Sequence, residues 1–254
     1  MRLMQLSNHS PMNSGKMAGL FVLLTLFVSA SYSQSNNRSK KNPVVDPYPA
    51  TIVKIGDHLR IFNDTTKGTS YHLAVCADVP DNSKPLKVAY QQETGHVFII
   101  LRKVIKEGDT LSRVFGFYPM GGLQTLLFKK TRSVIKDNSH REYDVGISRE
   151  LSAQQFDTIV ATAISLADRK YHMNRYNCYD YALGIFNSVA GASPLPIVHV
   201  RFPFIFGRGG SPCSIYRSFG ELAGNGSVWA SHIEFADRTA PISSAFRSKK
   251  AEYY

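Results

Sequence analysis

The sequence lacks the short motifs that identify several common enzyme classes. It has no HExxH, CxxC or HxH spacing, so its eight histidines indicate no zinc site, and we expect neither a metal nor another cofactor. A GxSxG elbow, a Walker loop and a Rossmann fingerprint are also missing. No RNA-binding or DNA-binding motif accompanies the basic residues, and we therefore expect no specific nucleic-acid partner.

Cysteine is scarce, with three residues in the chain, Cys76, Cys178 and Cys213. Three cysteines allow at most one disulfide and leave at least one free thiol. A bridge between Cys76 and Cys213 would leave Cys178 as the odd thiol. The alternative is three reduced cysteines with Cys76 packed in the core, and the sequence does not separate the two.

Acidic residues are few, with 19 Asp and Glu against 30 Lys and Arg, and the formal net charge is +11. This basic character suits solubility and flexible termini, or contact with anionic polymers. Lys16 precedes the apolar run 18–30, which is shorter than the roughly 20 residues that a bilayer span needs. We therefore predict a secretory signal peptide over 1–33, with an uncleaved anchor as the alternative, and a disordered linker over 34–48. The mature protein should be secreted or periplasmic and meet the membrane only through the signal segment; its oligomeric state stays open.

The rest of the chain predicts an α+β domain over 49–223 with its core at 90–220, followed by a loosely ordered tail over 224–254. Short apolar or β-branched stretches at 51–55, 59–62 and 71–75 indicate a small N-terminal β segment, which forms either a sandwich-like subdomain or the first strands of the main sheet. The strands 95–104 and 114–118 form a hairpin covered on both faces, a third strand follows at 142–147, and a loop of about twenty residues begins after Pro119. Helices are predicted after the capping box of Ser152 and Gln155, from Cys178 to Gly191, and over 214–222.

The residue with the clearest chemical potential is Cys178, in the string RYNCYD at the start of a predicted helix. Unpaired N–H groups and the helix dipole stabilise a thiolate there, so a thiol at this position can be mostly ionised when an imidazolium lies beside it. Its base is His96, which opens the predicted strand GHVFII. His140 is our choice to orient that ring, with Asp144 as the alternative. The backbone N–H of Cys178 and the side chain of Asn177 would receive an oxyanion.

The order of GHVFI, FGFYP, YDV, a capped helix and NCYDYAL resembles circularly permuted papain-like proteins related to NlpC/P60 peptidases and lecithin:retinol acyltransferases. It is also similar to a group of exported bacterial proteins with the same GH, GFYP and YNC blocks. The resemblance covers about 90–220 and implies a papain-like antiparallel sheet packed against helices. It further implies Cys178 as nucleophile, His96 as base and a polar orienter at or near His140. The string after the thiol differs from the Asn-Cys-Glu-His-Phe string of the acyltransferases, which argues against lipid acyl transfer.

Together these features predict an exported cysteine hydrolase, an amidase or thiol protease, that acts on cell-wall peptide or another extracytoplasmic amide. Its partner would be a peptide or peptidoglycan-like substrate. One alternative is a non-catalytic binding module on a papain-like scaffold, with the aromatic segment 202–206 and the basic clusters as its contact surface. Another is a secreted deamidase or acyltransferase effector that uses the same cysteine and histidine.

Overall fold

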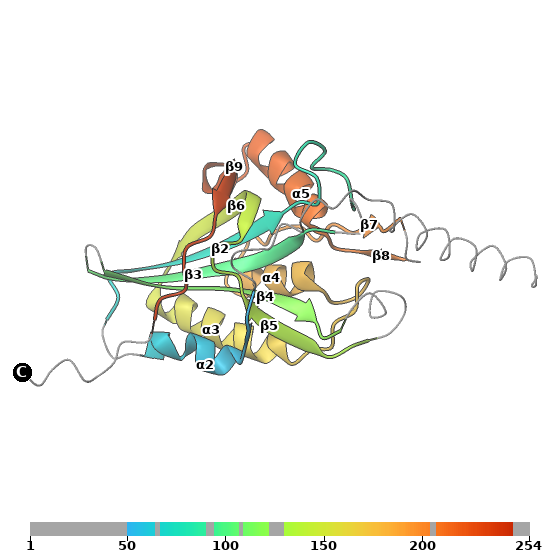
Figure 1. Ribbon diagram of the computed structural model, residues 1–254. Coiled ribbons are helices and arrows are strands. Elements are labelled where there is room, and N and C mark those ends of the chain that lie inside the picture. Colours follow the sequence, from blue (N-terminus) through green and yellow to red (C-terminus); the bar gives the residue numbers. More distant parts are fainter. Residues whose placement is uncertain are drawn as a thin grey trace, which may run out of the picture. The chain divides into compact units, whose positions relative to one another are not determined.

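The protein is represented by a computed structural model that describes residues 50–63, 67–89, 94–106, 109–121, 130–203 and 207–245 (Figure 1). The predicted signal peptide over 1–33 and linker over 34–48 lie outside these ranges. None of the helices within them has the length and apolar character that a bilayer span requires.

A seven-stranded antiparallel sheet organises the fold, with the strand order β1-β5-β4-β3-β2-β6-β9. Its strands are β1 (Ile52–Val53), β2 (Ser70–Asp78), β3 (His96–Lys106), β4 (Asp109–Pro119), β5 (Ser133–Asp137), β6 (Glu142–Leu151) and β9 (Ile233–Thr239). A separate pair is formed by β7 (Val200–Arg201) and β8 (Arg208–Gly209). The helices are α2 (Ile55–Leu59), α3 (Ala153–Ala167), α4 (Cys178–Asn187) and α5 (Pro212–Gly224), with the 3-10 turns η2 (Arg60–Asn63) and η4 (Ala230–His232). The predicted α+β class with an antiparallel sheet is thus confirmed.

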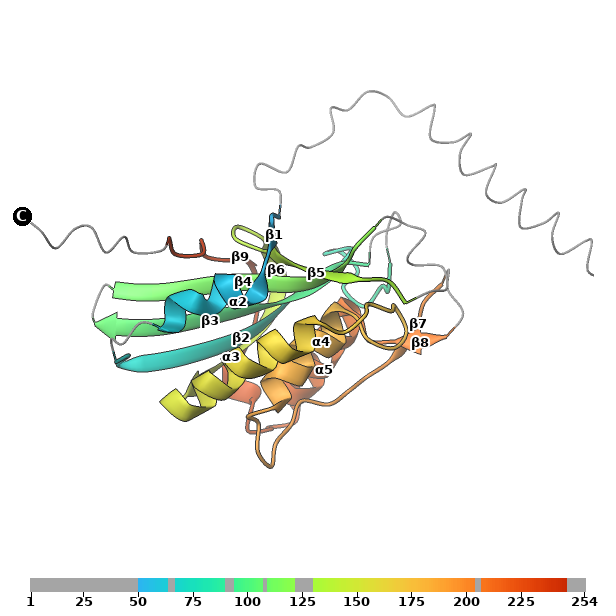
Figure 2. The ribbon, with the colours of Figure 1, turned by 90° about the horizontal axis from the view of Figure 1, so that it is seen from below.

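Side chains of β3 alternate between two apolar clusters, one on each face of the sheet. Val97, Ile99 and Leu101 join the main cluster with residues of α3 and α4, which lie along one face (Figure 2). Phe98 and Ile100 belong to a smaller cluster on the other face. Because both faces are covered, β3 reads as a nearly continuous apolar run, as the sequence indicated.

The predictions that depended on apolar strand patterns and on helix capping residues are confirmed. The predicted hairpin is β3–β4, and the strand predicted at 142–147 is β6. Ser152 and Gln155 form the reciprocal capping box of α3. The helix predicted to begin at Cys178 does begin there, although it ends at Asn187 rather than Gly191.

Three predictions of local structure were wrong. The stretch 59–62 is helical, because Ile55, Leu59 and Phe62 recur at the spacing of one helix face and pack toward the core. The loop predicted over 120–138 contains β5; its residues 122–129 lie outside the described ranges. The predicted loose tail supplies η4 and the edge strand β9, whose mostly exposed side chains carry no alternating apolar pattern.

All three cysteines are buried and free, so the bridge between Cys76 and Cys213 is not formed. Cys76 belongs to the smaller apolar cluster, and Cys213 lies in the first turn of α5 beside Ser211, whose hydroxyl is 3.0 Å from its sulfur. Of the two alternatives, the structure has the reduced one.

Candidate active site

Asn177 fixes where α4 begins. Its side chain accepts the N–H of Tyr179 at 2.8 Å, and the carboxylate of Asp180 accepts the N–H of Asn177 in return. Both amide hydrogens of Asn177 are donated to backbone carbonyls, those of Met173 at 2.7 Å and Gly210 at 2.9 Å. Asn177 therefore has no hydrogen left for an oxyanion, contrary to the expectation from the sequence. The N–H of Cys178 itself, in the first turn of the helix, remains the natural donor.

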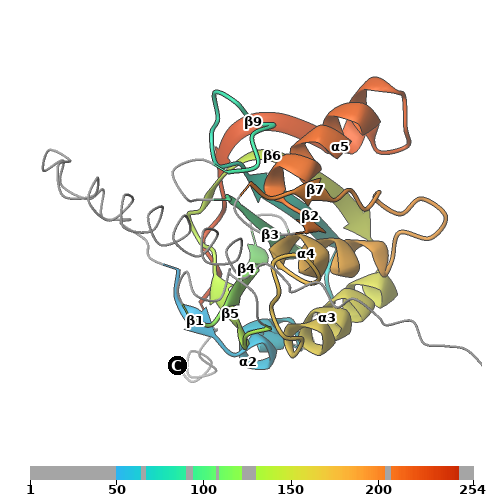
Figure 3. The ribbon, with the colours of Figure 1, turned by 90° about the vertical axis from the view of Figure 1, so that its right-hand side faces the viewer.

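The Cys178 sulfur lies at the beginning of β3. Helix α4 packs against β3 and β4 (Figure 3), and the backbone N–H of Val97 faces the sulfur and lowers the thiol pKa. Val97 directly follows His96 in the strand. The fold thus brings the two sequence-predicted residues, 82 positions apart by subtraction of their numbers, to the same end of the sheet.

The thiol is not ionised at rest. Burial raises the pKa of Cys178 to about 11, and the nearby carboxylate of Asp180 raises it further; the N–H groups of Val97 and Tyr179 and the charge of Arg141 oppose this shift. The expectation of a thiolate required an imidazolium beside the thiol, and burial keeps the His96 ring neutral instead. Helix N–H groups do act on the sulfur, but at 8% exposure desolvation outweighs them.

His96 is held rigidly against its neighbours. Its ring is 4% exposed and stacks on that of Tyr118, with centroids 4.1 Å apart. Burial chiefly lowers its pKa well below the ordinary value, and the charges of Arg141 and Lys136 lower it too, while the side chain of Asn138 raises it. The imidazole is therefore neutral at neutral pH.

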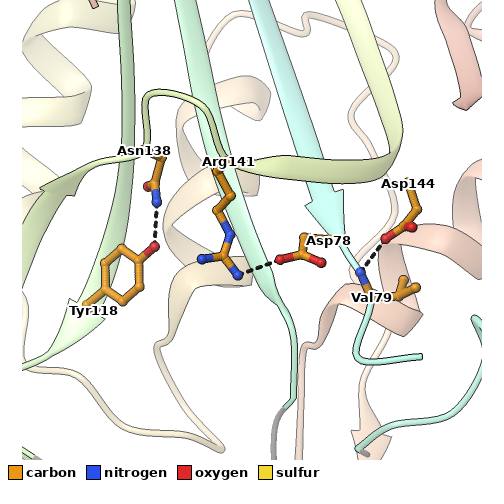
Figure 4. Close-up of polar contacts among 6 residues, drawn as sticks. All are labelled: Asp78, Val79, Tyr118, Asn138, Arg141 and Asp144. Carbon is orange, nitrogen blue, oxygen red and sulfur yellow. Dashed lines mark hydrogen bonds and ion pairs between the residues drawn. The ribbon is translucent and has the colours of Figure 1, made fainter. Parts of the chain in front are cut away.

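Asn138 is the side chain placed at the Nε2 atom of His96. Both Nε2 and the Asn138 Oδ1 lie over the α-carbon of Gly116, so close that a Cβ there would be under 3.0 Å from each. Within the described part of the chain neither atom has another hydrogen-bond partner. Their own pairing falls outside hydrogen-bond geometry, although the Asn138 side chain is close enough to raise the pKa of His96. The Asn138 amide is fixed from its other end, where Nδ2 donates to the hydroxyl of Tyr118 at 2.5 Å (Figure 4).

Sequence reasoning missed Asn138, which lies two residues before His140. The signal available was its residue type, because a Cys-His-Asn set is the form that this chemistry takes in papain-like proteases. An amide that accepts from Nε2 leaves Nδ1 as the ring nitrogen for a proton from the thiol.

The two predicted orienters have other surroundings. His140 lies in the turn between β5 and β6 with a φ of 65°, and its N–H donates to the carbonyl of Ala240 at 3.2 Å; its role at the ring stays a prediction. Asp144 accepts the N–H of Val79 at 2.6 Å (Figure 4), and burial chiefly raises its pKa. Asp144 thus secures the end of β2 and lines a cavity of about 290 Å³ with Asp237.

An ion pair lies beside His96, Tyr118 and Asn138. Arg141 and Asp78 form an ion pair beside the Tyr118–Asn138 contact (Figure 4). Asp78 lies opposite His96 in the β2–β3 register, so the pair is adjacent to the ring. Burial raises the pKa of Tyr118 to about 12, so its hydroxyl is protonated and can act as donor or acceptor. No group of three His, Cys, Asp or Glu side chains within the described ranges is arranged to hold a metal ion.

Comparison with known proteins gives no match to a family model, to a curated protein or to a solved structure. The assignment of the site therefore depends on its own geometry.

Proposed function

We propose that this protein is a cysteine hydrolase that cleaves an amide, with Cys178 as nucleophile, His96 as base and Asn138 as the group that orients the base. The observations that support the proposal are the placement of the Cys178 sulfur against the N–H of Val97, the residue after His96, and the close approach of the His96 Nε2 and the Asn138 Oδ1 at Gly116. The order of the sequence blocks and the α4–β3 packing support a papain-like arrangement of these elements.

The mechanism begins from a neutral pair, because burial opposes both charges. His96 takes the thiol proton on Nδ1 while the sulfur bonds to the carbonyl carbon of the substrate. The oxyanion is received by the N–H of Cys178. His96 then gives its proton to the leaving amine, and water hydrolyses the acyl-enzyme with His96 again as the base.

The basic composition and the predicted export signal favour an extracytoplasmic substrate, and we propose cell-wall peptide. Purified protein should release amino groups from isolated peptidoglycan or its soluble peptides. Cys178→Ala and His96→Ala should reduce the release to the uncatalysed background. Cys213→Ala is the matched control, since that thiol is also buried and free, and it should keep full activity.

A Cys178→Ala variant as active as the unchanged protein would refute the assignment of the nucleophile. Labelling by iodoacetamide gives a second readout that needs no substrate. It should modify Cys178 before Cys76, which is less exposed (1% against 8%) and whose pKa burial raises even more strongly. Loss of labelling should accompany the Cys178→Ala change alone.

The second candidate is a non-catalytic binding module, and the raised pKa of the Cys178 thiol favours it. Such a module has a place for a small polar ligand. A cavity of about 380 Å³ opens on the sheet face away from α4, with His72, Arg102 and Tyr143 in its lining. If peptidoglycan is bound but not cleaved, and the binding survives Cys178→Ala, this candidate replaces the hydrolase.

A further inference from the structure

The segment that follows β9 is hydrogen-bonded to the turn that contains Asn138. The N–H of Ala240 donates to the carbonyl of Arg141 at 2.8 Å, and the carbonyl of Ala240 accepts from the N–H of His140. Ala240 packs in the smaller apolar cluster on one face of the sheet, and the chain contacts the same turn again at Ser243. The turn is thus held between Ala240 and Ser243.

Ser243 makes three hydrogen bonds there. Its N–H donates to the hydroxyl of Ser139 at 2.8 Å, and its own hydroxyl donates to the carboxylate of Asp137 at 3.1 Å. The same hydroxyl accepts the N–H of Val114 at 3.1 Å. Asp137 and Ser139 are the two neighbours of Asn138 in the chain, so Ser243 contacts the residue on either side of the proposed orienter.

The hydroxyl of Ser243 satisfies a backbone group at the point where β4 loses its pairing with β5. Strand β5 pairs with β4 only from Phe115 to Pro119, so β4 loses its neighbour at Val114. The two backbone groups of Val114 are then satisfied by different partners: its N–H by the hydroxyl of Ser243, and its carbonyl by the N–H of Asn138 at 3.0 Å. Val114 thus joins Ser243 and Asn138 through one peptide segment.

We propose that Ser243 is a positioning residue for the candidate active site. By fixing Asp137, Ser139 and Val114 around Asn138, it keeps the Asn138 amide over Gly116 and thereby holds His96 in the orientation that leaves Nδ1 for the thiol. The inference depends on the proposed roles of Cys178, His96 and Asn138, and it makes the segment after β9 a support of the candidate active site.

Ser244 provides a matched control. Its hydroxyl accepts the N–H of Ser112 at 2.9 Å, and its N–H donates to the carbonyl of Ser112 at 2.9 Å. These bonds attach the same segment to β4 without contacting the turn over 137–141. A change of Ser244 to Ala therefore tests the attachment of the segment, whereas the same change at Ser243 tests the position of the turn.

The experiment measures alkylation of Cys178 by iodoacetamide between about pH 6 and pH 9, a range that brackets the ordinary pKa of a thiol, with peptide mapping to locate the label. A positioned general base accelerates a reaction by roughly 10²–10⁴-fold. Partial misplacement of His96 should therefore slow alkylation on the order of tenfold and move the pH dependence of the alkylation rate to higher pH. We expect this for Ser243→Ala and for Asn138→Ala. Ser244→Ala should stay near the rate of the unchanged protein, and Ser243→Thr, which keeps the hydroxyl, should restore it. Circular dichroism checks that each variant is folded.

Unchanged alkylation in Ser243→Ala, with slow alkylation in Asn138→Ala, overturns the role of Ser243 and leaves the proposed function intact. Unchanged alkylation in both His96→Ala and Asn138→Ala overturns the proposed function, and the role of Ser243 with it. Should Ser243→Ala not fold, Ser139→Ala removes the hydroxyl that Ser243 contacts and must slow alkylation in the same way. A wild-type rate in Ser139→Ala then refutes the inference.

Discussion

Substitution of Gly116 by alanine is the most direct test of the site geometry. Gly116 lies on β4 opposite Phe98 of β3, and both the Nε2 of His96 and the Oδ1 of Asn138 would be under 3.0 Å from a Cβ at that position. Real Cβ atoms essentially never make contacts that short. The alanine methyl must therefore displace the imidazole, the amide or the strand.

The expected loss of stability follows from two opposing contributions. Alanine in a strand is favoured over glycine by roughly 0.5–1 kcal/mol. Forcing a methyl group into a filled space costs about 1–3 kcal/mol, and the space is filled here because His96 is 4% and Asn138 1% exposed. We expect Gly116→Ala to lower the free energy of unfolding by about 1–2 kcal/mol.

Gly146 on β6 supplies the control. A Cβ there would have its nearest neighbours, the Tyr143 ring and the Cys76 sulfur, at 3.4 and 3.6 Å, which are far less crowded. Gly146→Ala should therefore be neutral or stabilising by up to about 1 kcal/mol. Urea denaturation gives both free energies, and alkylation of Cys178 should be slowed by the change at Gly116 alone. If Gly116→Ala is as stable as Gly146→Ala and is alkylated at the wild-type rate, His96 and Asn138 do not face each other across this strand.

Two further changes test the packing around the sheet. Burial chiefly lowers the pKa of His58 to about 4. The unfolded chain, in which the pKa of this histidine is about 6.5, therefore binds a proton more readily than the folded protein does. The contribution of neutral His58 to stability is complete above about pH 6.5 and decreases by roughly 3 kcal/mol as the pH falls toward 4. His58→Phe, which keeps a ring beside Phe115, should flatten that part of the pH–stability curve, and an unchanged curve would contradict it. Ser152→Ala removes the acceptor for the N–H of Gln155 and should cost about 1 kcal/mol, whereas Ser152→Gly should cost only a few tenths; equal thermal stability of the two variants would argue against the capping box.

The parts of the fold that the sequence predicted have local causes. A capping box involves residues three positions apart, so Ser152 and Gln155 mark the start of α3 without knowledge of the rest of the chain. The same holds for Asn177 and Asp180 at α4. Because the helix start was predictable, so was the position of Cys178 within it.

The parts that were missed depend on pairing between distant segments. Strand β9 is an edge strand with mostly exposed side chains, and its partner β6 lies about ninety residues earlier in the chain. The segment after it is held by the hydroxyls of Ser243 and Ser244. Neither an exposed edge nor a set of serine hydroxyls produces an apolar period, so the sequence pattern could not distinguish this region from a tail.

Asn138 was missed for the same physical reason, and its position determines what the site can do. Burial keeps both Cys178 and His96 neutral, and a neutral imidazole can accept a proton at only one nitrogen. If Nε2 carries the hydrogen and faces the Asn138 oxygen, Nδ1 accepts a proton. If Nδ1 carries the hydrogen instead, the lone pair is on Nε2, which faces Asn138 and Gly116, and no base is available to the thiol. Under the proposed function, activity therefore requires the β4–β5 register that places Asn138 over Gly116. A change that leaves Cys178 and His96 intact but shifts this register should abolish catalysis without unfolding the protein.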